Sequence, residues 1–288
     1  MMRIERHDDP ARFFAVVAPF LERREAAHNL QLGFRARLEA DRHAFGAADP
    51  LLYAALADSG DVIAVATQTP PFGLVLSELE DLEIVAALAD RLAQDGAVLP
   101  TAGGPVAVAR AFAERWASLT GAAPSVHIEE RIYEADSVVH PAGVSGAMRP
   151  YGAEDRPLVI AWMRAFFDEA MPGSPEAQVE RFVDGRAAGI GSLVLWQDGG
   201  TAVSLAGHAG ETPNGARVGP VYTPPEHRGR GYASALTAAL TEELLRRRRF
   251  CFLYTNLANP TSNSIYQRIG YRPVTDVTVW QFGEAAGR

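Results

Sequence analysis

The sequence contains a single cysteine, Cys251, and no lysine. One cysteine cannot form an intrachain disulfide, which excludes a disulfide-stapled scaffold and is typical of a reducing compartment. All 27 basic residues are therefore arginines, which we attribute to GC-rich codons rather than to chemistry. Cys251 lies in a stretch that reads as a buried strand, where a cysteine is most often an inert core residue.

The chain also lacks an apolar run of the roughly 20 residues that a membrane-spanning helix needs. The first residues, Met1–Arg6, have no apolar stretch of the kind found in signal peptides. We therefore expect a cytoplasmic protein with no membrane partner. The net charge is −8, whereas nucleic-acid binders usually present a basic face, so no nucleic-acid partner is expected. No cysteine, histidine and aspartate cluster has the spacing of metal ligands, so no metal is predicted.

Length and periodicity predict two similar halves. A chain of 288 residues with 48% hydrophobic residues is long enough for two globular domains. Each half reads as a strand, two helices, several strands, a helix and a strand, which indicates an α/β or mixed α+β fold. Residues 138–145 contain Pro141 and Gly143 and form the candidate linker. We predict domains at residues 1–140 and 146–288.

A glycine-containing loop between a strand and a long helix carries the first chemical signal. The stretch runs from Val218 to Ser234 and contains Gly229 and Gly231. The first amides of a helix have no intrahelical partner, and glycines let a ligand approach the backbone closely. Such a loop suits a phosphate group. It matches neither the P-loop nor the dinucleotide-binding fingerprint, and taken alone it also fits an ordinary helix start.

Two motifs in order resemble the GNAT acetyltransferase superfamily. Residues 228–233, Arg-Gly-Arg-Gly-Tyr-Ala, resemble the Arg/Gln-x-x-Gly-x-Gly/Ala signature of that family. Residues 253–271 resemble its second block, a strand, an asparagine, a short helix with a tyrosine, and a Gly-Tyr turn. The resemblance covers residues 146–282 and implies a central, mostly antiparallel sheet flanked by helices. The first half has only Gly103-Gly104-Pro105 before a helix, so we interpret it as a degenerate GNAT-like domain without a cofactor loop.

The resemblance also implies a site for acetyl-CoA as co-substrate. Its pyrophosphate would lie on the amides of the loop, and its pantetheine arm would pair with the preceding strand in a splay between two strands. Tyr266 matches the position whose hydroxyl protonates the leaving thiolate. From periodicity alone, the same tyrosine would be a packing residue. The implied cofactor-binding residues are Val221, Tyr222, Thr223, Arg228, Gly229, Arg230, Gly231, Tyr232, Ala233, Asn259 and Asn263.

The acceptor and its general base stay open at this stage. We expect transfer to a small-molecule amine or a protein amino group, by a monomer or a homodimer. The base could be Glu211, His208, Glu169, Tyr222 or water. Alternatives to acetyl transfer are an enzyme that uses another acyl-CoA, as in glycine N-acyltransferases, and a CoA-binding regulatory module without catalysis. The layout in two halves also resembles that of mycothiol synthase.

Overall fold

The computed structural model describes residues 2–170, 176–187 and 191–283. The chain divides into two compact units. The first comprises the residues up to Ile132, Thr255–Asn259 and the chain from Pro273 onward, and the second comprises Tyr133–Tyr254 and Pro260–Arg272. This division differs from the predicted boundary at residues 140–146, because the last strand lies with the first unit.

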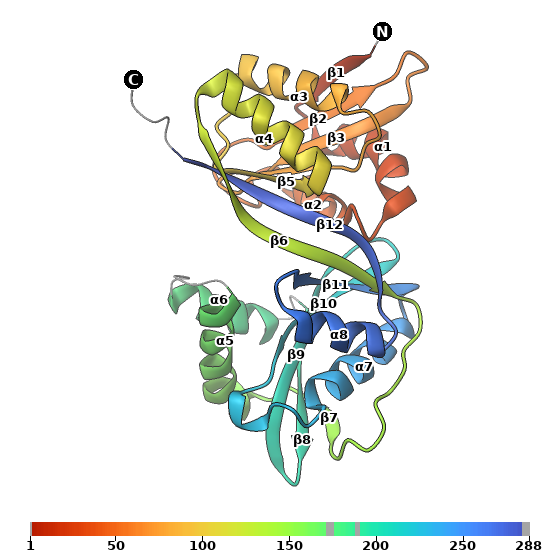
Figure 1. Ribbon diagram of the computed structural model, residues 1–288, viewed down its shortest axis with the longest axis vertical. Coiled ribbons are helices and arrows are strands. Elements are labelled where there is room, and N and C mark those ends of the chain that lie inside the picture. The colour runs from red at the N-terminus through yellow and green to blue at the C-terminus, as the bar shows by residue number, and fades with distance from the viewer. Residues whose placement is uncertain (1, 171–175, 188–190, 284–288) are drawn as a thin grey trace. The chain divides into compact units, whose positions relative to one another are not determined.

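The first half of the chain follows the expected alternation of helices and strands (Figure 1). The first helix starts where its local sequence favours it, since the Asp9 carboxylate caps the amides of Ala11 and Arg12 and Pro10 is the first helical residue. The elements are β1 (Arg3–His7), α1 (Pro10–Leu21), the 3-10 turn η1 (Glu22–Arg24), α2 (Asn29–Ala40), β2 (Leu51–Leu56), β3 (Val62–Gln68), β4 (Leu74–Leu76), α3 (Glu83–Gln94), β5 (Thr101–Pro105), α4 (Val106–Thr120) and β6 (Ala123–Ala135).

The second half repeats this order of elements, as the two-halves prediction requires. The elements are β7 (Ala147–Pro150), the 3-10 turn η2 (Ala153–Asp155), α5 (Arg156–Ala170), α6 (Glu176–Ala187), β8 (Ser192–Asp198), β9 (Thr201–Glu211), β10 (Gly215–Tyr222), the 3-10 turn η3 (Pro225–His227), α7 (Tyr232–Leu245), β11 (Phe250–Asn256), α8 (Pro260–Arg268) and β12 (Arg272–Gly283).

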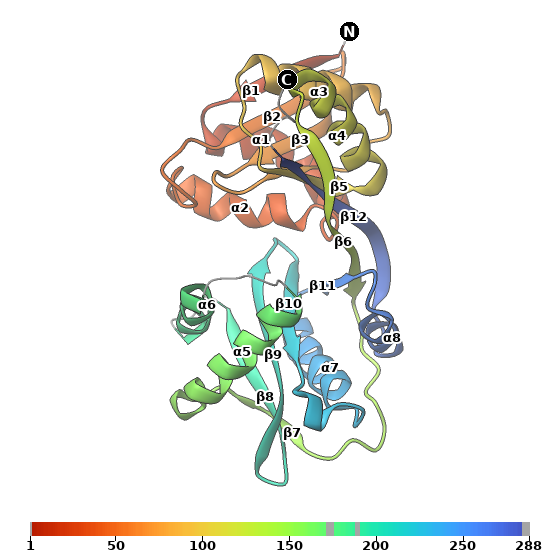
Figure 2. The ribbon, with the colours of Figure 1, turned by 60° about the vertical axis from the view of Figure 1, so that its left-hand side comes forward.

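Each unit buries both faces of its sheet. In the first unit, α1 and α2 cover one face through a cluster with Phe13 and Leu21, and α3 and α4 cover the other through a cluster with Leu88 and Phe112. In the second unit, α5 and α6 pack on one face and α7 and α8 on the other (Figure 2). Most neighbouring strands are antiparallel, while β4–β5 and β10–β11 are parallel. The predicted mixed α/β fold is therefore confirmed.

The last strand of the chain joins the sheet of the first unit. The strand order of that unit is β1-β2-β3-β4-β5-β12-β6, and the order in the second unit is β11-β10-β9-β8-β7. In β5, Gly103 and Gly104 form strand backbone rather than a loop before a helix. A Cβ at Gly103 would lie 3.0 Å from Val279 Cγ2, and one at Gly104 would lie 2.9 Å from the Leu76 carbonyl oxygen. These glycines therefore serve close strand packing.

In the part of the chain that the structure describes, no helix is both long enough and apolar enough to cross a membrane.

Candidate functional site

Strand β10 loses one of its two neighbouring strands partway along its length. Its parallel pairing with β11 covers only Gly215–Arg217, although both strands continue beyond that point. On its other side, the register with β9 shifts between Val218 and Val221, which marks a bulge at Gly219 and Pro220. Beyond Arg217, β10 and β11 thus run on without pairing, which is the splay expected for the cofactor arm.

The side chains at the end of β10 alternate between the two faces of the sheet, as a strand requires. Val221 packs against the core cluster that holds α7 and Tyr266, whereas Tyr222 belongs to the cluster beneath α5. The Tyr222 carbonyl oxygen accepts a hydrogen bond from Ser204, and the Thr223 hydroxyl lies 2.8 Å from the same serine oxygen. These residues are held in place, so the strand offers a rigid edge to the splay.

The loop after β10 presents a row of free backbone amides. Gly229 and Gly231 have φ angles of +78° and +83°, a left-handed conformation that favours glycine. A Cβ at Gly231 would lie 2.8 Å from Val144 Cγ2. Within the described residues, the amides of residues 229–234 donate no hydrogen bond, whereas the Arg228 amide already donates to the Pro225 carbonyl oxygen. The candidate anion cradle is therefore residues 229–233, and the predicted Arg228 amide is not part of it.

The first residue of α7 anchors this loop. Tyr232 is buried, and its hydroxyl donates to the Asp198 carboxylate at the end of β8, with an O–O distance of 2.6 Å. Ser145 donates to the same carboxylate oxygen. These hydrogen bonds lower the pKa of Asp198, so the carboxylate stays ionised and continues to accept the hydrogen bond from Tyr232. The role of Tyr232 is thus to position the helix start through its side chain, while its amide stays open.

The Arg228 side chain is already committed to α5. One terminal nitrogen lies 2.7 and 3.0 Å from the two carboxylate oxygens of Glu169, and Nε donates to the Thr223 carbonyl oxygen at 2.8 Å. The ion pair raises the pKa of Arg228. Both side chains are about half exposed, at 47% and 53%, so the ion pair itself contributes at most about 1 kcal/mol of stability. A phosphate can therefore compete for this guanidinium.

Tyr266 lies on α8 with its ring in the core and its hydroxyl unengaged. The residue is 9% exposed, and its ring is 6.1 Å from that of Tyr271 and 6.4 Å from that of Tyr133. Across the described residues, the Tyr266 hydroxyl makes no hydrogen bond. Its oxygen nevertheless keeps some surface exposed to solvent. Burial raises the pKa of Tyr266 to about 12, so the phenol is a proton donor at neutral pH.

The two predicted asparagines mark the start of α8. Asn259 directly precedes α8, and its amide donates to the carbonyl oxygen of Asn256, the last residue of β11. The Asn263 side-chain oxygen accepts a hydrogen bond from the Tyr133 hydroxyl, which in turn accepts one from Gln267. This chain of hydrogen bonds fixes the helix that carries Tyr266. Asn263 thereby acts as a positioning residue for α8.

Three of the candidate general bases are occupied by arginines. Glu169 is paired with Arg228, and Glu211 accepts a hydrogen bond from Arg248. Arg247 can only donate, so His208 Nε2 accepts from it at 3.2 Å, and the opposite nitrogen, Nδ1, donates to the Ser192 hydroxyl at 2.7 Å.

The consequence for proton abstraction is clearest at His208. Both ring nitrogens are engaged, and burial together with the Arg247 charge lowers the pKa of His208. Burial raises the pKa of Tyr222, so its phenol stays protonated at neutral pH and cannot accept a proton from the amine. Water is thus the candidate base that can act without breaking a hydrogen bond or ion pair between side chains of the site.

Sequence reasoning missed the contacts of two arginine groups. The ion pair of Arg228 with Glu169 joins residues far apart in the chain, and no local pattern predicts it. At the end of α7, Arg247 and Arg248 reach back to His208 and Glu211 on β9, and no local pattern predicts these contacts either. Cys251 is buried, and burial raises its pKa to about 12, which fits the predicted inert role. Among the residues described, no group of side chains is arranged to hold a metal ion.

Comparison with known proteins bears on the fold as a whole. Residues 200–281 match the family model described as FR47-like protein. A GCN5-related N-acetyltransferase from Sphaerobacter thermophilus is 17% identical with a TM-score of 0.58, covering 98% of this chain and 95% of that one. A GNAT-family acetyltransferase from Colwellia psychrerythraea is 10% identical with a TM-score of 0.57, covering 97% and 98%. A tandem GNAT protein from the clavulanic acid biosynthesis pathway is 14% identical with a TM-score of 0.53, covering 100% of both chains. A search of curated proteins finds no match.

The chain therefore has the fold of the GNAT superfamily, and the resemblance that the two motifs indicated is confirmed. The likeness to the tandem protein extends over the full chain, in agreement with two halves that share one order of elements. The match to the FR47-like description lies within the second half of the chain, at residues 200–281.

Proposed function

We propose that this protein is an acetyl-CoA-dependent N-acetyltransferase that transfers the acetyl group to a primary amine by direct attack. The observation that carries the proposal is the row of free amides at residues 229–233, placed where β10 and β11 run on without pairing. Amides at a helix start bind phosphate, and an unpaired strand edge can pair with the amide groups of the pantetheine arm. Both features occur together in the second half.

The residues around this edge have separate tasks in the proposed reaction. The edge formed by Val221, Tyr222 and Thr223 aligns the thioester, and a β10 amide polarises its carbonyl in the manner of an oxyanion hole. The amine nitrogen forms a bond to the carbonyl carbon, the carbon–sulfur bond breaks, and the amine loses a proton to water. Tyr266 donates its hydroxyl proton to the departing sulfur, so that free CoA leaves as a thiol, and the phenolate regains a proton from the water that accepted the amine's proton.

The test is an assay of thiol release with acetyl-CoA against a library of primary amines, including lysine-containing peptides. We expect release that depends on one amine class, together with binding of one acetyl-CoA per chain by calorimetry. Butyryl-CoA in parallel tests the alternative acyl donor. Binding of acetyl-CoA without turnover of any amine would leave a CoA-binding module, and absence of binding would refute the proposed function.

A further inference from the structure

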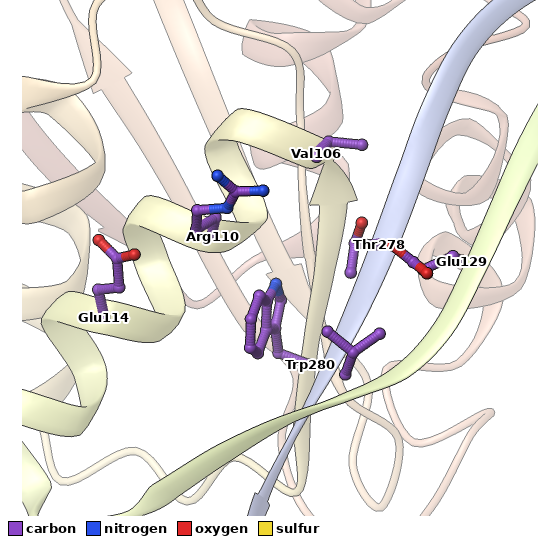
Figure 3. A pocket seen from close by; sticks show the side chains of 7 residues that line it. Val106, Arg110, Glu114, Glu129, Thr278 and Trp280 are labelled. Atoms are coloured by element: carbon purple, nitrogen blue, oxygen red, sulfur yellow. The ribbon is translucent and has the colours of Figure 1, made fainter.

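The first unit contains a cavity of about 360 Å³ that the acyl-transfer site does not use (Figure 3). It is bounded by α4, β6 and β12. All of its lining residues belong to the first unit, whereas the amide row and Tyr266 belong to the second. Its volume lies within the range of about 300–1,000 Å³ typical of small-molecule sites.

Two hydrogen-bonding groups on β12 line this cavity without a partner. Thr278 is 3% exposed, and its hydroxyl oxygen makes no hydrogen bond within the described residues. The same is true of the indole nitrogen of Trp280, which is also buried. The two residues are two positions apart on one strand and therefore lie on one face of it. Buried polar groups are nearly always paired in native proteins, and an indole nitrogen can only donate. The missing partner is therefore a hydrogen-bond acceptor.

Charged side chains of both signs surround these groups. Figure 3 shows Arg110 on α4 and Glu129 on β6 on either side of Thr278 and Trp280. Arg110, Glu114 and Glu129 form no ion pair with one another or with other side chains in the part of the chain described. An acceptor that carries negative charge would match Arg110, and a cationic group on the same ligand would match the carboxylates.

We propose that this cavity binds a free α-amino acid with an aliphatic side chain. The ligand carboxylate would accept hydrogen bonds from Trp280, Thr278 and Arg110, and its ammonium group would meet Glu129. Val106 and Val126, which complete the lining, offer apolar contacts to the side chain. A simple carboxylate would leave the glutamates unmatched, and a simple amine would leave both β12 donors unpaired. Both donor atoms are shielded from water in the ligand-free structure, so binding requires side chains that line the cavity to rearrange.

The experiment follows the indole N–H signal of Trp280 by nitrogen-15 NMR on the full-length protein, with Trp280→Phe used to assign the signal. Each common protein amino acid is titrated separately. L-leucine is compared with 4-methylpentanoate, which lacks its ammonium group, and with 3-methylbutylamine, which lacks its carboxylate. We expect a saturable shift with at least one aliphatic amino acid. Loss of a charge-assisted hydrogen bond should weaken binding of each truncated analogue by about tenfold or more.

Two variants separate binding from folding. Thr278→Val removes the unpaired hydroxyl, so it should bind the amino acid about tenfold more weakly while the ligand-free protein melts no lower than wild type. Arg110→Gln should weaken binding to a similar degree, whereas Arg115→Gln, on the same helix but paired with Asp90 outside the cavity, should leave it unchanged.

The outcome decides the proposal in either direction. It is overturned if no amino acid shifts the indole signal saturably, if either analogue binds as tightly as leucine, or if both variants bind like wild type. None of these readouts requires acetyl-CoA, so failure of the proposed acetyl transfer and failure of this site can be distinguished.

Discussion

Replacing Tyr266 by phenylalanine tests the leaving-group chemistry most directly. The ring contacts with Tyr133 and Tyr271 survive the substitution, and the lost hydroxyl has no hydrogen bond within the described residues. We therefore expect a stability change within about 0.5 kcal/mol. Turnover should fall by about 10²-fold, the low end of the range for general acid catalysis, because a thiolate is a fairly good leaving group. That loss corresponds to about 2.7 kcal/mol of transition-state stabilisation.

The pH dependence of the wild-type enzyme carries a second signature of the same residue. Only the protonated phenol can donate to sulfur. Burial raises the pKa of Tyr266 to about 12, so its acid form persists well above the pH of about 10 at which an ordinary tyrosine is half ionised. Ionisation of Tyr266 should therefore cause no fall in the acetyl-transfer rate up to about pH 10. The rate should fall only as the pH approaches 12.

The assay combines steady-state kinetics with the acetyl-CoA dissociation constant, measured on one preparation. An interaction formed only as sulfur gains charge lowers kcat without weakening ground-state binding. Tyr271→Phe is the matched control, because it should lower stability rather than turnover. It breaks a buried hydrogen bond with Thr241, so it should cost about 1 kcal/mol of stability and leave turnover near that of wild type. Turnover of Tyr266→Phe within about twofold of wild type would refute the argument and leave water as the acid.

Three further variants test the rest of the site. Gly231→Val should abolish acetyl-CoA binding by calorimetry, because valine disfavours a φ of +83° and its Cβ would lie 2.8 Å from Val144 Cγ2, so the loop that carries the amide row would have to shift, whereas Gly33→Val, with open space around its Cβ, should bind normally. Retained binding in the Gly231 variant would exclude the amide row as the anion site. Glu169→Gln should tighten acetyl-CoA binding severalfold, since it releases the Arg228 guanidinium for the phosphates; weaker binding would show that the ion pair holds the loop in its active shape. A fragment of residues 141–288 should be poorly soluble or inactive, because its last strand loses the β5 partner; a soluble fragment with full turnover would contradict this.

The local sequence sufficed for the elements whose signals lie within a few residues of one another. The cap at Asp9, the loop with Gly229 and Gly231, and the helix that carries Tyr266 all depend on neighbouring backbone and side-chain chemistry. The order of two motifs around a helix and a strand was specific enough to predict the GNAT fold, since those elements recur in fixed order in that superfamily.

The tertiary structure alone decided which distant groups meet. Strand β12 reads from its sequence as the last strand of the second half, yet it pairs with β5, because hydrogen bonding between strands has no signature in local sequence. The pairing of Arg228 with Glu169 engages a predicted phosphate ligand and a candidate base at once, and it joins residues far apart in the chain. The sequence offered His208 as one of several candidate bases, and only its contacts with Ser192 and Arg247 showed that both ring nitrogens are in use. Residue types and spacing thus determined the kind of site, whereas long-range contacts determined which of its side chains remain available.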